Sequence, residues 1–315
     1  MALRDPLDGK LVVLIGGSGF LGTHVAQDLL QRGARLRIAA RSPEKAFRLE
    51  PLARLGQMQS VRCDVARRES LERALVGADA VVFLVGTFGS NAQALQADGA
   101  GMAAQIAAAN GASAFVYVSA IGADASSDSL YARTKGDGER QVLAAFPRAT
   151  ILRPSVLFGE DDAFVNMFAR LIAGLRIMPV FGAGSQLQPL WVDDAAAAIT
   201  HVLADPRAHG GTTYEIAGPE VLTMGELNER IAAAQGRKRR FWNVPDGLAG
   251  LFARLPGTPM GPDQWQLLQR GSVASGSAPG LAELGVTPRP LGLFLDRWML
   301  QYRKAGRFGI KTEPA

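Results

Sequence analysis

Two residues in this chain of 315 have the types and the spacing of a proton-transfer pair. Tyr131 and Lys135 lie four positions apart at the start of a helix predicted over 131–145, so their side chains share one face. A lysine ammonium beside a phenol favours the phenolate form, which makes the tyrosine a usable general acid or base. The alternative is a surface tyrosine with an incidental lysine one turn away.

A glycine-rich turn indicates what such a pair would act on. Gly16, Gly19 and Gly22 lie at the turn from an apolar run over 11–15, a predicted strand, into a helix predicted over 20–32. The first glycine permits the tight turn, the second lets a pyrophosphate approach the backbone, and the third lets the helix pack closely. The helix N-terminus adds unpaired N–H groups. We therefore expect a dinucleotide site, with Tyr131 assisting hydride transfer to or from a nicotinamide. A glycine turn that binds nothing is the alternative.

The end of the second predicted strand bears on the choice of cofactor. A dinucleotide site selective for NAD usually places Asp or Glu there to accept from the ribose 2′-hydroxyl. This chain has Arg41 and Ser42 instead, and a cation at this point favours a 2′-phosphate. We expect NADP(H) as the preferred cofactor. NAD(H) is the alternative, because Glu44 could reach back and leave Arg41 as a solvated loop residue.

Strands and helices alternate through the first half of the chain. This rhythm predicts an α/β fold: a doubly wound parallel sheet of the Rossmann type, with a smaller C-terminal α/β lobe. We place the nucleotide-binding domain at 1–158, with 190–205 packing back on it, and the smaller lobe at 159–189 and 206–315. The expected strands are 11–15, 35–40, 60–63, 80–85, 114–119 and 150–153, and the expected helices are 20–32, 43–55, 67–75, 91–110 and 131–145.

Composition narrows the class of protein. Hydrophobic residues make up 48% of the chain, enough for a sizeable core, and the net charge of +5 fits anionic cofactors or surfaces. Without a recognition-helix or aromatic-strand signature, we expect no nucleic-acid partner. The single cysteine, Cys63, and three scattered histidines show no metal-ligand spacing, so we expect no metal. With no long apolar stretch, the expected location is the cytoplasm.

These motifs resemble the short-chain dehydrogenase/reductase superfamily in its extended and atypical branches. The three glycines match the cofactor glycines of that family, and Asp64 matches its adenine-contacting residue. The segments 153–159 and 191–194 match motifs that follow the sixth strand. A narrower similarity, to the family of the complex I accessory subunit called alpha-subcomplex subunit 9, is carried by the turn over 16–22 and by the segments 131–139 and 146–162.

The resemblance implies a set of site residues. The catalytic residues would be Tyr131, Lys135 and Ser119. The cofactor-binding residues would be Gly16, Ser18, Gly19, Phe20, Leu21, Gly22, Arg41, Ser42, Asp64, Val65, Val85, Gly86, Tyr131, Lys135 and Pro154.

One departure from the family weakens the expectation of turnover. Active members carry a Ser or Thr two residues after the serine that ends the fifth strand, and this chain has Ile121 there. Three loop serines, Ser126, Ser127 and Ser129, are candidate substitutes for that hydroxyl. Asp98 also stands where extended members often carry Asn. We expect an NADPH-binding protein with a structural or sensing role. The alternative is an active NADPH-dependent reductase or epimerase acting on a carbonyl, sugar-nucleotide or quinone-type substrate.

Two basic segments bear on partners. The C-terminal segment 291–308 surrounds Trp298 with Arg297, Arg303, Lys304 and Arg307, which suits an anionic membrane surface or a partner such as a respiratory complex. A peripheral position at the cytoplasmic membrane face would follow. The alternative is a terminal helix packed on the smaller lobe. The basic run over 237–240 is interpreted as a solvated edge.

Overall fold

The computed structural model describes residues 5–255 and 260–303. Contacts divide the chain into two units. The larger comprises Met1–Ser155, Val192–Ala217 and Ala274–Thr287, and the smaller comprises Val156–Trp191, Gly218–Val273 and Pro288–Ala315.

A seven-stranded parallel sheet forms the centre of the larger unit, which confirms the predicted α/β class. Every residue of the two central strands β4 and β5 is buried, as expected where helices cover both faces of a sheet. The strand order is β11-β6-β5-β4-β1-β2-β3. The strands are β1 (Leu11–Ile15), β2 (Arg35–Ala40), β3 (Met58–Arg62), β4 (Ala80–Phe83), β5 (Ala114–Val118), β6 (Thr150–Pro154) and β11 (Thr213–Ile216).

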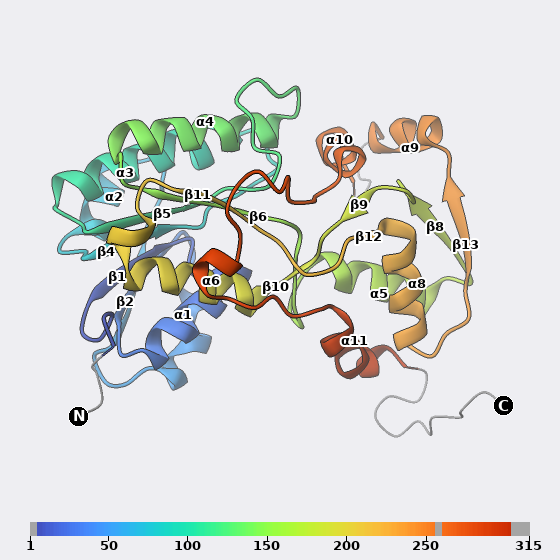
Figure 1. Ribbon diagram of the computed structural model, residues 1–315, viewed down its shortest axis with the longest axis horizontal. Helices are drawn as coiled ribbons and strands as arrows, with labels where there is room; N and C mark the ends of the chain where they lie inside the picture. Colours follow the sequence, from blue (N-terminus) through green and yellow to red (C-terminus); the bar gives the residue numbers. More distant parts are fainter. Residues whose placement is uncertain (1–4, 256–259, 304–315) are drawn as a thin grey trace. The chain divides into compact units, whose positions relative to one another are not determined.

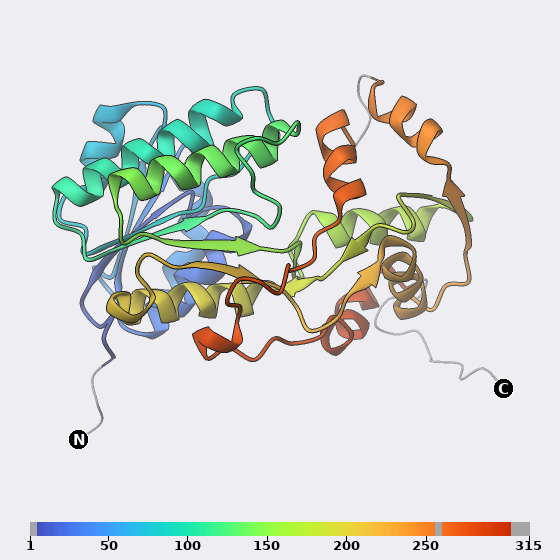
Figure 2. The ribbon, with the colours of Figure 1, turned by 45° about the horizontal axis from the view of Figure 1, so that its top comes forward.

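Helices cover both faces of this sheet (Figures 1 and 2). One layer consists of α2 (Arg68–Leu75), α3 (Gly99–Ala109) and α4 (Leu130–Ala145), and the other of α1 (Phe20–Gln31) and α6 (Val192–Ala204). In the second layer, a contact between side chains joins α1 to α6: His24 Nδ1 lies 2.5 Å from the Asp193 carboxylate. Asp193 belongs to the 191–194 motif, so that motif joins two helices of the larger unit. The short helix α7 (Pro206–His209) follows α6.

Three local features differ from the sequence expectations. The helix expected over 91–110 starts with a π-helical turn, Gln93–Asp98, and the helix expected over 43–55 is a 3₁₀ segment, Pro43–Leu52. The segment 206–315, expected in the smaller lobe, is divided between the units, since β11 pairs with β6 in the central sheet. A strand of four residues is too short for its periodicity to reveal its partner.

The smaller unit packs helices against three short strand pairs. Its core contains residues from α5 and α8 and from all three pairs. The pairs are β7 (Leu157–Phe158) with β10 (Leu190–Trp191), β9 (Gln186–Leu187) with β12 (Leu222–Thr223), and β8 (Ile177–Phe181) with β13 (Arg240–Val244). The helices are α5 (Phe164–Gly174), α8 (Met224–Ala234), α9 (Asp246–Ala253), α10 (Pro262–Arg270) and α11 (Gly292–Trp298).

The described part of the C-terminal segment packs into the smaller unit. Leu295 and Trp298 of α11 are each only 4% exposed, and the Trp298 indole N–H donates to Asn166 Oδ1 at 3.1 Å. The apolar face expected to meet a membrane is therefore part of the core, as the alternative interpretation held. Lys304 and Arg307 lie outside the described residues. Within the described ranges, no helix is long and apolar enough to cross a bilayer.

Candidate functional site

The three glycines of the β1–α1 turn serve three different purposes. Gly16 has φ +83°, a conformation that side chains disfavour, and its N–H donates to the Ala39 carbonyl at 2.8 Å. A Cβ on Gly22 would lie 2.6 Å from the Gly17 Cα, so only glycine lets the helix start against the turn. A Cβ on Gly19 would have one neighbour, the Gly16 carbonyl oxygen at 3.3 Å. Gly19 thus borders open space at the N-terminus of α1, where a phosphate can approach the backbone.

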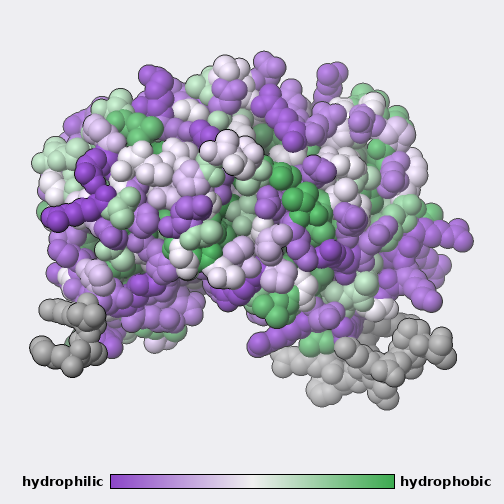
Figure 3. Space-filling view, viewed as in Figure 1, coloured by the Kyte–Doolittle hydropathy of each residue, from purple (hydrophilic) through white to green (hydrophobic). Residues whose placement is uncertain are grey.

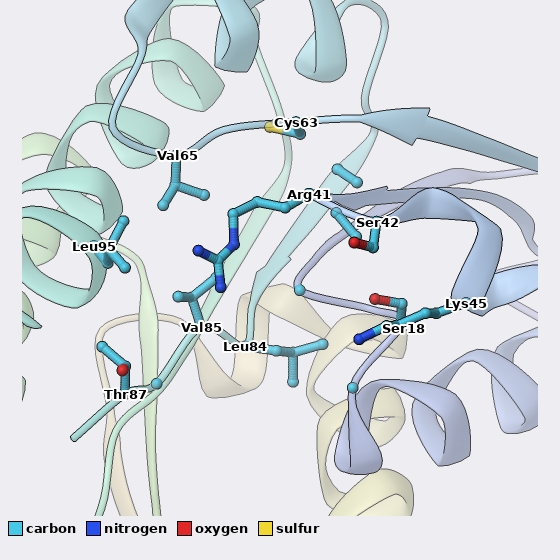
Figure 4. A pocket seen from close by; sticks show the side chains of 15 residues that line it. Ser18, Arg41, Ser42, Lys45, Cys63, Val65, Leu84, Val85, Thr87 and Leu95 are labelled. Carbon is cyan, nitrogen blue, oxygen red and sulfur yellow. The ribbon is translucent and has the colours of Figure 1, made fainter. Parts of the chain in front are cut away.

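This turn forms one wall of a cavity of about 330 Å³ at the carboxyl ends of β1, β2 and β4 (Figure 4). Eight of the predicted cofactor residues line it, namely Gly16, Ser18, Gly19, Arg41, Ser42, Val65, Val85 and Gly86. The carboxyl edge of a parallel sheet is where dinucleotides bind in such folds. The sequence prediction did not include the other lining residues, which are Ala39, Ala40, Lys45, Cys63, Leu84, Thr87 and Leu95.

Two cations give the cavity its charge. Figure 4 shows the Arg41 side chain extending from the end of β2 toward Val65 and Val85, while the Lys45 ammonium lies on the side of Ser18. Among the described residues that line the cavity, none carries a carboxylate, and Glu44 is not one of them. Lys45 was not predicted, because its direction depends on the pitch of the segment that follows β2. One turn of the following 3₁₀ segment returns it to the same opening.

Apolar side chains form the opposite wall. Cys63, Val65 and Leu95 are each at least nine-tenths buried and line the cavity together. Burial raises the pKa of the Cys63 thiol, which favours its neutral form. Asp64, predicted as an adenine contact, does not line the cavity. Its carboxylate accepts from the Ala66 N–H at 3.1 Å, within the turn that leads into α2.

Four other predicted cofactor residues, Phe20, Leu21, Gly22 and Pro154, also do not line the cavity. Phe20 packs edge-to-face on His24 within α1, at 5.5 Å between ring centroids. The Pro154 carbonyl, at the end of β6, accepts from the Ile121 N–H at 3.0 Å. Leu21 lies beside Phe20 on α1 and, like Gly22, does not border the cavity.

Lys135 is buried beneath the cavity floor. Its ammonium donates to the carbonyls of Val85 (3.1 Å) and Val118 (2.8 Å), and it would lie 3.6 Å from a Cβ at Gly86. The lysine therefore reaches a segment that lines the cavity. Burial disfavours its charged form and lowers its pKa to about 7, against a smaller opposing influence of Glu139.

Tyr131 lies one turn before Lys135, as predicted, but its ionisation differs from the expectation. The Lys135 Nζ is 6.0 Å from the centroid of the Tyr131 ring, and burial raises the pKa of the phenol to about 12. The phenol is therefore not activated by its neighbour in this arrangement. The ring of Tyr131 stacks on Phe88, with centroids 4.5 Å apart.

A buried glutamine connects this helix to the cavity, and the sequence prediction did not include it. Gln96 lies in the π-helical turn and is fully buried. Its Oε1 accepts from the Thr87 N–H at 2.9 Å, and its Nε2 donates to Thr134 of α4. Asp98, the residue considered from sequence, instead accepts from Gln93 and Gln141 near the surface. The π-helical turn is what brings Gln96 inward.

Ser119, predicted as catalytic, belongs to a buried charge network. Its hydroxyl donates to Glu139, whose carboxylate also receives two hydrogen bonds from Arg153, at 2.8 and 2.6 Å. Arg153 further approaches Glu215 of β11 at 3.8 Å. Because a buried carboxylate needs such partners, these contacts give Ser119 a structural role across β5, α4, β6 and β11.

The three loop serines are also occupied locally. Ser129 caps α4 by accepting from the Ala132 N–H at 3.2 Å, and Ser127 accepts from the Ser129 N–H. The Ser126 hydroxyl donates to Asp124 at 2.7 Å. Each of these three hydroxyls therefore has a partner within its own turn.

The chain belongs to a family of NAD(P)H-binding proteins, and its parallel sheet, glycine turn and Tyr131–Lys135 helix resemble those of extended short-chain dehydrogenases/reductases. A family model described as NAD(P)H-binding matches residues 16–165. The fold is similar to that of a nucleoside-diphosphate-sugar epimerase from Staphylococcus aureus, with a TM-score of 0.73 and 16% identity over 91% of this chain and 99% of that one.

Relatives by sequence fall into two groups. The mitochondrial protein "NADH dehydrogenase (ubiquinone) 1 alpha subcomplex subunit 9" of Arabidopsis thaliana is 28% identical over 96% of this chain and 80% of its own length. A "ceramide reductase" of Caulobacter vibrioides is 30% identical over 75% of this chain and 74% of its own length. The chain thus has an NAD(P)H-binding domain and resembles both a respiratory-complex subunit and a reductase.

Proposed function

We propose that this chain is an NADPH-binding accessory protein of a respiratory complex, in which the nucleotide has a structural or sensing role and turnover is weak or absent. The observation that carries the nucleotide choice is the pair of cations, Arg41 and Lys45, in a cavity whose described lining has no carboxylate. A 2′-phosphate needs cationic donors, whereas a ribose 2′-hydroxyl is best held by an acid.

The residues present fit a dinucleotide phosphate. Gly19 and the start of α1 would hold the pyrophosphate, because the space beside Gly19 is open and the helix N-terminus is partly positive. Arg41, Ser42 and Lys45 would hold the 2′-phosphate. The apolar wall of Val65 and Leu95 suits the adenine ring, and Lys135 is placed to donate to the nicotinamide ribose. When bound, the cofactor would supply a hydride.

The polar groups around Tyr131 support a role other than turnover. A reductase must orient a carbonyl oxygen toward its proton donor, and Ile121 replaces the hydroxyl that does so in active members of the family. The nearby serines are occupied in turns and caps, and Ser119 bonds to Glu139. Burial also raises the pKa of Tyr131 to about 12, far above the pH at which an efficient proton donor would have to act.

The respiratory partner is proposed from the full-length similarity to complex I subunits. Its test is purification of the native protein from its own membranes under mild detergent. We expect stoichiometric NADP(H) after denaturation, together with co-purifying subunits of a respiratory complex. Recovery of the chain alone, with no bound nucleotide, would overturn the proposal.

An active NADPH-dependent reductase is the second candidate. It is favoured by the 30% identity to a ceramide reductase and by the Tyr131–Lys135 pair on one helix face. The two candidates differ in one property, NADPH oxidation driven by a carbonyl substrate. Brisk oxidation that depends on Tyr131 would establish the second.

A further inference from the structure

Helix α9 of the smaller unit buries its two alanines and exposes its two leucines. Ala249 and Ala253 are buried, whereas Leu248 and Leu251 are 52% and 60% exposed. Their spacing of three places the two leucines on one stripe. No charged residue occurs from Gly247 to Ala253. Large aliphatic side chains gathered on one exposed stripe of a short helix indicate a surface that is covered by something else.

The strand pair β8–β13 continues this apolar surface. Met178 and Val180 of β8 point into the core, so the opposite face of the pair carries Ile177 and, on β13, Trp242, at 59% and 52% exposure. Phe252 of α9 stacks on Phe181 of the same strand, with centroids 4.9 Å apart. That contact fixes α9 over one end of this face and leaves the other end uncovered.

Basic side chains surround the uncovered end. A surface pocket of about 580 Å³ is lined by Ile177 and four cations, Arg176, Lys238, Arg239 and Arg240, which we call the basic pocket. Arg239 is held in place by donating to the Ile172 carbonyl at 2.8 Å. Within residues 5–255 and 260–303, none of the four cations forms an ion pair with a carboxylate. Over 231–262 the sequence has a single acidic residue, Asp246.

We infer that this surface, formed by the α9 leucines, Trp242, Ile177 and the basic pocket, docks on the surface of an anionic phospholipid bilayer. Interfacial helices bury an apolar face at the headgroup boundary, tryptophan prefers that depth, and clustered Lys and Arg bind lipid phosphates. Figure 3 shows hydrophobic atoms at the upper right over α9 and hydrophilic atoms along the right-hand edge below them. In this proposal Lys238, Arg239 and Arg240 face lipid, whereas the sequence interpretation has the run over 237–240 as a solvated edge.

Charge decides between a lipid and other occupants. Four cations around one pocket are complementary to the phosphate layer of an anionic bilayer, which presents negative charge over its whole surface. The leucine stripe alone would fit many partners. A leucine stripe on α9 combined with a basic pocket beside β8 and β13 fits an anionic lipid interface best.

The test is flotation of the full-length protein with vesicles of phosphatidylcholine, with and without phosphatidylglycerol. We expect binding only to the anionic vesicles, and loss of most binding as salt rises from about 0.1 to 0.5 M, because the Debye length shortens. Replacing Leu248 and Leu251 together by serine should weaken partitioning by roughly tenfold or more. Replacing Arg176 and Lys238 together by serine should weaken it about tenfold on anionic vesicles.

The matched control is Leu293→Ser, which removes a leucine that is 64% exposed on α11 outside this surface. We expect no change in flotation for it, and unchanged thermal unfolding for all variants since the altered side chains are exposed. If the wild-type protein does not float, or if only Leu293→Ser loses binding, the inference is wrong. Binding to protein-containing membranes but not to protein-free vesicles would also overturn it and would assign the surface to a protein partner. NADPH affinity, measured separately, tests the proposed function and does not depend on this result.

Discussion

The two ends of the nucleotide site differ in how their polar groups are used. Around the β1–α1 turn and the end of β2, the space beside Gly19 is open, and Arg41 and Lys45 face the cavity. Around Tyr131, the hydroxyls of Ser119 and Ser129 are already bonded within the protein. One end is therefore arranged to receive a ligand, and the other has its donors and acceptors paired internally.

Under the proposed function, binding a nucleotide and reacting with it are separable properties of one fold. The glycine turn depends on backbone geometry that only glycine permits at Gly16 and Gly22. Turnover would depend instead on how a substrate is oriented beside Tyr131. Substitutions at each end should therefore have different consequences.

The largest effect is expected at Gly19. Gly19→Val should weaken NADPH binding by about 100-fold or more, because its side chain would occupy the space the pyrophosphate needs. The protein should still fold, since the nearest atom to an added Cβ is the Gly16 oxygen at 3.3 Å. Titration calorimetry and circular dichroism measure both properties.

Gly22→Ala provides the contrast. Its Cβ would meet the Gly17 backbone at 2.6 Å, so we expect a loss of stability in addition to any loss of binding. If Gly19→Val also unfolds the protein, or retains stoichiometric NADPH, the distinction between the two glycines fails.

The second effect concerns cofactor preference. Arg41→Asp should remove most of the preference for NADPH over NADH, because a charge-assisted contact contributes about 1.5 to 3 kcal/mol, or roughly 10-fold to 150-fold in affinity. Lys45→Ala should reduce the preference further. Arg35→Asp, the same charge change at the exposed start of β2, is the control and should leave the preference intact. Equal losses in the Arg41 and Arg35 variants would indicate a general charge effect.

The third effect is a dependence of stability on pH. Burial lowers the pKa of Lys135 from 10.5 to about 7, so between these values the unfolded chain binds more protons than the folded one. The free energy of unfolding should then rise with pH from 7 to 10, by at most about 1.4 kcal/mol per pH unit. Lys135→Met should lose this rise, whereas the exposed Lys45→Met should keep it. Urea denaturation at each pH measures the difference, and parallel curves for wild type and Lys135→Met would contradict it.

Much of the nucleotide end could be predicted from the sequence. The turn over 16–22 and the cation at Arg41 are local features, and eight of the predicted cofactor residues line the cavity. Lys45 escaped prediction because its position depends on the pitch of a 3₁₀ segment. Asp64 lies at the predicted strand end, but its carboxylate turns toward the Ala66 N–H, a preference that spacing does not reveal.

The Tyr131 end was harder to predict, because its state depends on contacts between distant segments. The role of Ser119 is set by Glu139, Arg153 and β11, which are brought together only by the sheet. The inward position of Gln96 follows from a π-helical turn, which the periodicity of the sequence did not predict. The assignment of β11 to the central sheet was missed for the same reason, since its partner β6 precedes it by about sixty residues.

Weak or absent turnover is tested by titrating the protein with NADPH under nucleotide fluorescence and then adding a panel of long-chain carbonyl, sugar-nucleotide and quinone substrates. We expect saturable one-to-one binding and an oxidation rate that stays at the protein-free background, with Tyr131→Phe giving the same traces. Rapid oxidation that Tyr131→Phe slows by about 100-fold or more, as expected on loss of a general acid, would contradict it.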